Sequence, residues 1–167
     1  QQAIHVLSPQ APRRRRVRCS AMGDGGDLDG RSYVVTGANT GIGRATAADL
    51  AARGGRVVLA TRSAEKTLPV IDELRAATGN SQLEHLPLDL TDLASVRQAA
   101  STLLEAGDPI DVLVANAGVA GQRGTTEQGF ELAFGVNHLG HFLFVTEVLP
   151  LVQAGTDARI VVVSSDS

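Results

Sequence analysis

The stretch YVVTGANTGIGRATAADLAARG, residues 33–54, decides the fold. A short apolar run typical of a buried strand leads into three closely spaced glycines, and a helical pattern follows at once. Gly37 lets the chain turn sharply, Gly41 leaves the backbone open to a ligand, and Gly43 lets the helix pack close to the strand. The free N–H groups and the positive end of that helix face the turn. The sequence therefore predicts a phosphate-binding turn made of Gly37, Asn39, Thr40, Gly41, Ile42 and Gly43.

From this stretch outward, apolar strand-like runs alternate with helical patterns. Strands are expected at residues 32–37, 56–61, 83–90, 110–118 and 158–165, and helices at 41–54, 63–79, 91–107 and 129–152. The strand runs are apolar on both sides, which is typical of a parallel sheet covered by helices on both faces. The expected fold class is α/β, a three-layer Rossmann-type doubly wound parallel sheet with strand order 3-2-1-4-5 and its remaining strands missing. Ligands bind such sheets at the switch point between the first and fourth strands.

The end of the second strand, VVLATRS, indicates which cofactor is bound. A protein that binds NAD usually places an Asp or Glu about 20 residues after the glycines, where it bonds the ribose 2′-hydroxyl. Residues 60–63 contain no acid, and Arg62 can instead form charge-assisted bonds with a 2′-phosphate. The sequence therefore predicts NADP(H), with a solvated surface arginine as the alternative interpretation of Arg62.

Five motifs in a fixed order carry a resemblance to a known family. They are T-G-x-x-x-G-I-G at 36–43, LDL at 88–90, NAG at 116–118, FGVNHLGHF at 134–142 and IVVVSS at 160–165. With these motifs the chain resembles the short-chain dehydrogenase/reductase family from residue 31 to its end. The stretch TEQGFELAFGVNHLGHF resembles the branch that holds retinol dehydrogenases, Tic32-like chloroplast-translocon proteins and, with a poorer match after NAG, protochlorophyllide reductases.

The resemblance implies cofactor contacts at two strand ends. Asp89 would contact the adenine with Leu90 beside the ring, and Asn116, Ala117 and Gly118 would border the nicotinamide ribose. The resemblance also implies that Asn116 ties neighbouring strands together. The residues by themselves leave another interpretation of Asp89 open, as a partner for the N-terminus of the next helix.

The catalytic roles implied by the resemblance fall on Asn137 and Ser165. Asn137 would order a water in a proton relay to a lysine, and Ser165, with Ser164 as the alternative, would bond the substrate oxygen. Without the resemblance, Asn137 also fits a satisfied buried amide, and serines after a strand also fit plain turn residues. The family's proton donor, a Tyr-x-x-x-Lys pair, is not found, because the only tyrosine is Tyr33 and the only lysine is Lys66.

Other kinds of site and partner are not expected. His138 and His141 have H-x-x-H spacing, but no further Cys, His or acidic residues cluster near them, so no metal site is predicted. The formal net charge of −3 argues against a nucleic-acid partner. No apolar run approaches the ~20 residues that span a bilayer, so no transmembrane segment is predicted.

The N-terminal residues differ from the rest in composition. Residues 1–22 hold five arginines and no acid, and residues 1–29 show no apolar periodicity, so we expect 1–29 to be disordered. The basic, acid-poor composition and the stretch VRCSA favour a chloroplast transit peptide. The alternatives are a nuclear-localisation or anionic-surface patch and a tail without a role, with a cytoplasmic location as the alternative to the plastid.

Residues 30–167 are then expected to form the N-terminal part of an NAD(P)-binding Rossmann domain. The chain begins at Gln1 and ends at Ser167 directly after an apolar strand, so we expect a fragment that is inactive by itself. The whole protein would be an NADP-dependent short-chain oxidoreductase that transfers a hydride between nicotinamide and a small carbonyl or alcohol substrate. The alternative is a non-catalytic NADP(H)-binding redox sensor attached to a partner complex. Assembly of the full-length protein into a homo-oligomer is left open.

Overall fold

The computed structural model describes residues 26–164. The predicted transit segment up to residue 25 and the predicted catalytic Ser165 lie outside the described residues. The strands are β1 (Ser32–Thr36), β2 (Arg56–Thr61), β3 (Leu83–Pro87), β4 (Val112–Ala115) and β5 (Arg159–Val162). The helices are α1 (Gly41–Ala52), α2 (Ala64–Thr78), α3 (Leu93–Ala106), α4 (Leu132–Phe134), the π-helical η1 (Gly135–Gly140) and α5 (His141–Gln153). Every expected strand and helix is present.

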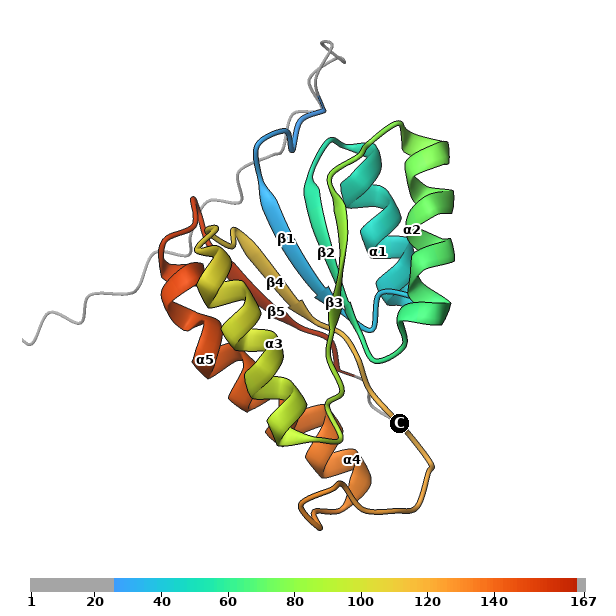
Figure 1. Ribbon diagram of the computed structural model, residues 1–167, viewed down its shortest axis with the longest axis vertical. Helices are drawn as coiled ribbons and strands as arrows, with labels where there is room; N and C mark the ends of the chain where they lie inside the picture. Colours follow the sequence, from blue (N-terminus) through green and yellow to red (C-terminus); the bar gives the residue numbers. More distant parts are fainter. Residues whose placement is uncertain (1–25, 165–167) are drawn as a thin grey trace, which may run out of the picture.

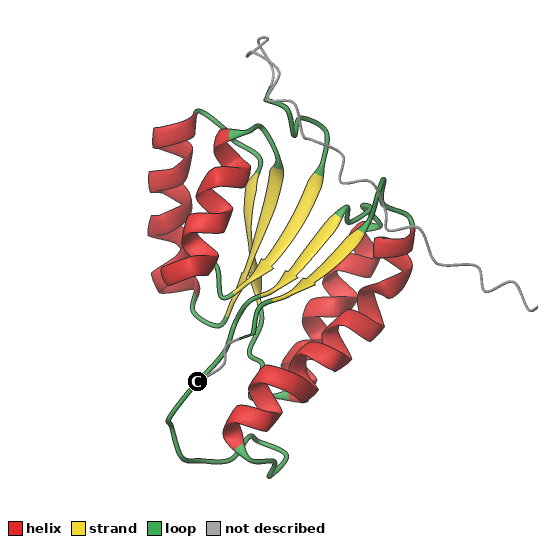
Figure 2. Ribbon diagram, turned by 180° about the vertical axis from the view of Figure 1, so that it is seen from behind, coloured by secondary structure: helices red, strands yellow, loops and turns green. Residues whose placement is uncertain are grey.

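All five strands lie in one parallel sheet with the order β3-β2-β1-β4-β5, as the sequence predicts. The central β1 pairs with β2 on one side and β4 on the other, so that Val34 stands beside Val58 and Leu113. Helices α1 and α2 cover one face of the sheet, and α3 and α5 cover the other (Figure 1, Figure 2). The switch point therefore lies between the carboxyl ends of β1 and β4.

Two apolar clusters hold the three layers together, one on each face of the sheet. Val35 packs in the same cluster as Ile71 of α2, and Val34 packs in the same cluster as Phe144 of α5. Each of these four side chains is at most 1% exposed. Neighbouring residues of one strand thus contribute to both clusters, which explains why the strands are apolar throughout.

The β5 edge differs from the rest of the sheet. Within residues 26–164 no strand pairs with its outer side, and the apolar side chains from Ile160 to Val163 are 39–70% exposed. Its inner side pairs with β4, with Val161 beside Val114. An apolar strand with a free edge favours pairing with a further strand.

The long helix begins later and is less regular than its pattern predicts. The pattern predicts a helix over 129–152, but Gly129 has a φ of +81°. Glu131 caps the helix instead, by accepting bonds from two N–H groups of the first turn. The π-helical segment Gly135–Gly140 then interrupts the helix before α5 begins.

By length and composition only, Leu132–Gln153 is the one helix within residues 26–164 that could cross a membrane. The sequence does not suggest this, because Asn137 and His138 interrupt the apolar run, yet the mean hydropathy of the best window reaches 1.3. In the fold this helix contacts α3 and β4, and Phe144 and Val148 are fully buried. A core helix of a soluble domain passes the same test, so the feature is weak evidence for a membrane span.

Residues 26–29 form a turn that is bonded to the end of α1. The N–H of Leu28 donates to the carbonyl of Arg53 at 3.0 Å, and Nη2 of Arg53 lies 2.6 Å from Oδ2 of Asp27. The hydrogen bond from Arg53 holds the pKa of the Asp27 carboxyl below its usual value. These residues therefore belong to the folded domain, which corrects the boundary at residue 30 drawn from composition.

Candidate functional site

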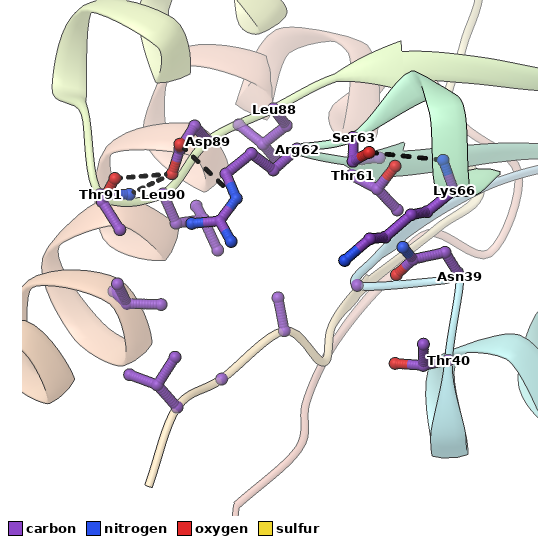
Figure 3. Close-up of a pocket in the computed structure, with 16 residues that line it drawn as sticks. Asn39, Thr40, Thr61, Arg62, Ser63, Lys66, Leu88, Asp89, Leu90 and Thr91 are labelled. Atoms are coloured by element: carbon purple, nitrogen blue, oxygen red, sulfur yellow. Dashed lines mark hydrogen bonds and ion pairs between the residues drawn. The ribbon is translucent and has the colours of Figure 1, made fainter. Parts of the chain in front are cut away.

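The carboxyl ends of β1, β2, β3 and β4 surround one cavity of about 300 Å³ at the switch point (Figure 3). Its lining residues are Gly37, Asn39, Thr40, Ala60, Thr61, Arg62, Ser63, Lys66, Leu88, Asp89, Leu90, Thr91, Ala117, Gly118, Val119 and Val136. The structure thus brings together predicted residues from the glycine turn, the second strand, LDL and NAG. The predicted catalytic Asn137 and four predicted cofactor-binding residues do not belong to the lining; the four are Gly41, Ile42, Gly43 and Asn116.

The glycine turn has the geometry that its spacing predicts. Gly37 has a φ of +67°, and an added Cβ there would stand 2.9 Å from Cα of Ala117. An added Cβ at Gly43 would collide with the carbonyl oxygen of Gly37 and with Nδ2 of Asn116. At Gly41 an added Cβ would meet no atom within 4 Å, so the backbone is open to a ligand there. Close packing at two glycines and open space at the third match the three predicted roles.

Helix α1 begins without a side-chain cap, unlike α2 and α3. The side chain of its N-cap residue, Thr40, makes no capping bond, and the first turn contains no acid. No other group of the described chain bonds the N–H groups of residues 41–43, and the Ile42 side chain is 68% exposed. By contrast, the side chains of Ser63 and Asp92 cap α2 and α3. Three donors at the positive end of α1 are therefore available to an anion.

Two cations extend over the cavity from the end of β2 and the first turn of α2 (Figure 3). The side chain of Arg62 is 73% exposed, and its Nε lies 3.9 Å from Oδ2 of Asp89. Because such a long, exposed ion pair contributes little, an anion can replace Asp89 as the partner of Arg62. Lys66 forms no ion pair with any residue between 26 and 164. Its amine extends past Asn39 toward the same space (Figure 3).

Asp89 is held by the turn that leads from β3 into α3. Its Oδ1 accepts bonds from the N–H of Thr91 at 2.9 Å and from the hydroxyl of Thr91 at 2.7 Å. The cap of α3 comes from Asp92, which accepts the N–H of Ala94 at 2.9 Å. The backbone N–H of Asp89 donates to Oγ of Ser95 in the first turn of α3 at 3.0 Å, so the interpretation of Asp89 as a partner for the N-terminus of that helix stays open. Its Oδ2 faces Arg62 at the cavity. The contact of Asp89 with an adenine stays a prediction.

Asn116 ties the end of β4 to the end of β1. Its backbone N–H and that of Ala117 both donate to Oγ1 of Thr36 at 2.9 Å, and its side-chain amide donates to the Thr36 carbonyl at 2.9 Å. The strand-tying contact implied by the resemblance is thus present. Asn116 supports Ala117 and Gly118, which line the cavity.

Asn137 lies within η1 and reaches the loop that follows β4. Its Oδ1 accepts the N–H of Val119 at 2.9 Å, and its Nδ2 donates to the Val119 carbonyl at 2.9 Å. Asn137 is exposed, so the interpretation as a buried amide is wrong. The two bonds hold Val119, a lining residue, against the helix. A role of Asn137 in a water relay stays a prediction.

Comparison with known proteins identifies the group to which this arrangement belongs. The family described as short chain dehydrogenase matches residues 31–167. The chain belongs to this family. Human retinol dehydrogenase 13 is 44% identical over 139 residues, which cover 83% of this chain and 42% of that protein. Human retinol dehydrogenase 11 is 47% identical over 139 residues, which cover 83% of this chain and 44% of that protein. The chain thus spans less than half the length of these relatives.

Solved structures of other short-chain dehydrogenases share the fold. A metagenomic short-chain oxidoreductase in complex with NADP is 34% identical, with a TM-score of 0.68 and coverage of 80% of this chain and 61% of that chain. The Pseudomonas aeruginosa RhlG/NADP active-site complex is 31% identical, with a TM-score of 0.67 and coverage of 80% and 54%. Both relatives are NADP complexes, so NADP binding occurs within the family on this architecture.

Of the candidates for the serine and the tyrosine that short-chain dehydrogenases use, the structure describes Ser164 and Tyr33. Ser164 lies two residues after the end of β5 and is exposed, whereas Ser165 lies beyond the described residues. Tyr33 on β1 is 3% exposed and packs against Gly55, and burial raises the pKa of its phenol. Tyr33 is therefore a core residue, in agreement with the prediction that it is not the proton donor.

His138 and His141 make separate contacts. His138 is exposed and stacks with Phe134 and Phe142, with ring centroids 5.3 and 6.4 Å away. His141 is buried, and its Nε2 lies 2.9 Å from Oγ1 of Thr36. Across residues 26–164 no group of three His, Cys, Asp or Glu side chains could hold a metal ion.

Sequence reasoning missed three residues that shape this short-chain dehydrogenase site. Lys66 follows the cap residue Ser63 by three positions, and this spacing could have placed it in the first turn of α2 beside the cavity. Thr36 and His141 lie 105 positions apart, and no local pattern links them. Their contact depends on the tertiary fold.

Proposed function

We propose that the whole protein is an NADP(H)-dependent oxidoreductase that transfers a hydride between nicotinamide and a carbonyl or alcohol carbon. One observation carries the proposal: Thr40, directly before the unbonded start of α1, and the cations Arg62 and Lys66 line the same cavity. A dinucleotide that bears a pyrophosphate and a 2′-phosphate matches both features. The NADP complexes among the solved relatives support the same cofactor.

The residues at the phosphate end fit this cofactor. The N–H groups of residues 41–43 would bond the pyrophosphate, because no group of the described chain already uses them. Open space at Gly41 gives a phosphate access to this backbone. Arg62 and Lys66 would bond the 2′-phosphate, with Arg62 exchanging its weak contact to Asp89 for a charge-assisted one.

The remaining lining residues divide between the two rings of the cofactor. Asp89 and Leu90 would border the adenine, and residues 116–118 would border the nicotinamide ribose. When bound, NADP(H) would exchange a hydride with the substrate carbon. Val119 and Val136 continue the lining with apolar side chains, which would reduce the access of water.

The proposed substrate is an alcohol or aldehyde with a large apolar body, as in retinol. Relatives named retinol dehydrogenase at 43–47% identity support this class. Because the chain spans less than half their length, the proposal concerns the whole protein and not residues 1–167 alone.

We assign proton transfer in the whole protein to a Tyr-x-x-x-Lys pair, which residues 1–167 do not contain. Tyr33 is buried in the core, and Lys66 lies at the end of the cavity assigned to the 2′-phosphate. Asn137 and Ser165 would orient the substrate oxygen and its proton relay. The sequence of the full-length transcript tests this point. A reading frame that continues without such a pair would favour the non-catalytic NADP(H) sensor.

The decisive experiment compares NADPH and NADH as cofactors for reduction of retinaldehyde by the whole protein, in the wild type and in Arg62→Asp. We expect the wild type to prefer NADPH. The ratio of kcat/KM values should fall about 10–100-fold in the variant, because a charged hydrogen bond contributes roughly 1.5–3 kcal/mol. Arg97→Asp is the matched control, since Arg97 is 61% exposed and its Nε also lies 3.9 Å from a carboxylate oxygen, on Glu147.

Three outcomes separate the alternatives. A preference for NADPH over NADH that falls in Arg62→Asp and does not change in Arg97→Asp supports the proposed 2′-phosphate site. An unchanged preference in Arg62→Asp refutes the role of Arg62. Binding of NADPH by the wild type without reduction of retinaldehyde or of a panel of other aldehydes and ketones favours the sensor.

A further inference from the structure

One ring of hydrogen bonds joins the ends of β1 and β4 to the π-helical segment. It starts at the backbone N–H groups of residues 116–117, which donate to Oγ1 of Thr36. It continues through His141, whose Nε2 lies 2.9 Å from Thr36 Oγ1 and whose Nδ1 lies 3.2 Å from the carbonyl oxygen of Asn137. It returns to the loop after β4 where the Asn137 side chain bonds Val119. The ring thus begins and ends at the wall of the cavity.

The π-helical segment explains why the Asn137 carbonyl takes a side-chain donor. In a regular α-helix this carbonyl would accept the N–H of His141, four residues later. Here the N–H of His141 donates to the carbonyl of His138 instead. The Nδ1 atom of the His141 imidazole lies 3.2 Å from the same Asn137 carbonyl oxygen. Single-turn π segments of this kind are frequent at functional sites.

The bonds at Thr36 determine which nitrogen of His141 carries the proton. A hydroxyl group has two acceptor lone pairs and one hydrogen to donate. The N–H groups of residues 116–117 occupy both lone pairs, so the hydroxyl hydrogen needs an acceptor. Nε2 of His141 at 2.9 Å is nearer than the Val114 carbonyl at 3.4 Å. Nε2 therefore accepts, and Nδ1 carries the proton that is donated to Asn137.

Burial favours the same neutral state of the ring. His141 is 7% exposed, and desolvation lowers the pKa of its imidazole. A neutral ring with its proton on Nδ1 satisfies Thr36 and Asn137 together. A doubly protonated ring would direct a second donor at Thr36, whose lone pairs are already occupied.

We propose that His141, as its Nδ1–H tautomer, is a positioning residue that fixes Asn137 and the cavity wall at residues 117–119. The link to turnover rests on the proposed function, because residues 116–118 border the part of the cavity assigned to the nicotinamide ribose. His141 touches neither the cofactor nor the substrate in this arrangement. It acts through the Asn137 carbonyl on one side and through Thr36 on the other.

The first test measures the tautomer of the His141 ring directly and does not depend on enzymatic turnover. ¹⁵N chemical shifts of the histidine rings in the whole protein should show His141 neutral and protonated at Nδ1. Thr36→Ser keeps a hydroxyl group and should preserve this tautomer, whereas Thr36→Val removes the donor and should shift the ring toward the Nε2–H form. A wild-type ring protonated at Nε2 overturns the proposal.

The second test separates positioning from general structural support. In His141→Phe we expect kcat to fall ~10²-fold, as for a misplaced catalytic geometry, while the Kd for NADPH stays within ~2-fold because the phosphate end is intact. His138→Phe, on the exposed face of the same helix, is the control and should leave both constants within ~2-fold. An unchanged kcat in His141→Phe overturns the proposal. If the wild type does not turn over, the proposed function fails, and the tautomer measurement alone decides the role of His141.

Discussion

Helices α1 and α3 both begin after a strand of the same sheet, yet their first turns are completed differently. At α3, the carboxylate of Asp92 accepts the N–H of Ala94 at 2.9 Å. At α1, Thr40 makes no side-chain bond and the first turn holds no acid. A capped end satisfies its donors within the chain, whereas an uncapped end leaves them for a ligand. The comparison teaches that the proposed phosphate site is marked as much by a cap that is missing as by the glycines that are present.

The largest effect is expected from a side chain at Gly43, where α1 packs on the switch point. An added Cβ would collide with the Gly37 carbonyl and the Asn116 amide, so Gly43→Ala should lower the free energy of unfolding by about 3 kcal/mol. Urea denaturation of the whole protein measures this change. Gly124→Ala is the control, because its nearest neighbour, Cδ2 of Leu132, is 3.6 Å away. Equal stability of the two variants would contradict the close packing of α1.

An acidic cap added to α1 should make its first turn resemble that of α3, which Asp92 caps. In Thr40→Asp the new carboxylate would accept the free N–H groups and repel the phosphates. We expect NADPH affinity to fall about 10–100-fold, since charged hydrogen bonds of roughly 1.5–3 kcal/mol are lost, with no loss of stability. Titration calorimetry with NADPH and urea denaturation measure the two quantities. Thr40→Ser, which adds no charge, is the control, and wild-type affinity in Thr40→Asp would show that the phosphates bind elsewhere.

Helix α2 is capped within the chain and also faces the proposed ligand. Ser63 caps its first turn, and Lys66 in that turn extends over the cavity. Lys66→Ala should reduce the preference for NADPH over NADH by about 10-fold, a smaller effect than that of Thr40→Asp because the flexible ammonium is a single point charge. Lys66→Arg keeps the charge and should keep most of the preference. Competition binding with the two cofactors measures this ratio. Equal losses in the two variants would argue against an electrostatic role.

The smallest effect is expected at α4, whose cap is an acid. Bonds from the N–H groups of Phe134 and Ala133 lower the pKa of Glu131 from 4.5 in the folded state. The folded protein therefore binds fewer protons than the unfolded chain near this pH. The contribution of Glu131 to the free energy of unfolding is complete above about pH 4.5 and is lost as the pH falls through the folded-state pKa. Glu131→Gln should lower the urea midpoint slightly at neutral pH and not at acidic pH. An equal difference in urea midpoint between Glu131→Gln and the wild type at both pH values would contradict the role of the Glu131 carboxylate as the cap of α4.

The strand order could be predicted because every strand carries its own local signal. Runs such as RVVLAT are buried on both faces and are separated by helices of ordinary length, which leaves few topologies. The grouping of residues at the proposed phosphate end of the cavity could be predicted for a related reason. Gly37, Arg62 and Asp89 each follow the end of a strand within two residues, and the carboxyl ends of parallel strands meet at one edge of the sheet.

The rest could not be predicted because it depends on contacts between distant residues. Nothing near Thr36 in sequence indicates that its hydroxyl meets His141. The π-helical turn at Asn137 has no periodic signature, and the apolar period continues through it. The start of the long helix was misplaced because Glu131 fits a helix interior as well as a cap. Local periodicity reports which face of a helix is buried and not which side chains bond one another.

The strand order also has a consequence for the time course of synthesis. Tyr33 of β1 pairs with Val57 of β2 across one short crossover, but its other neighbour, Val112 of β4, is made 79 residues after it. Because short loops close at lower entropic cost, β1, β2 and β3 with their helices can assemble while β4 is still within the ribosome. We expect a nascent chain to complete the phosphate end of the cavity first. The other end, at residues 117–119 and Val136, is added only when the ribosome has released η1.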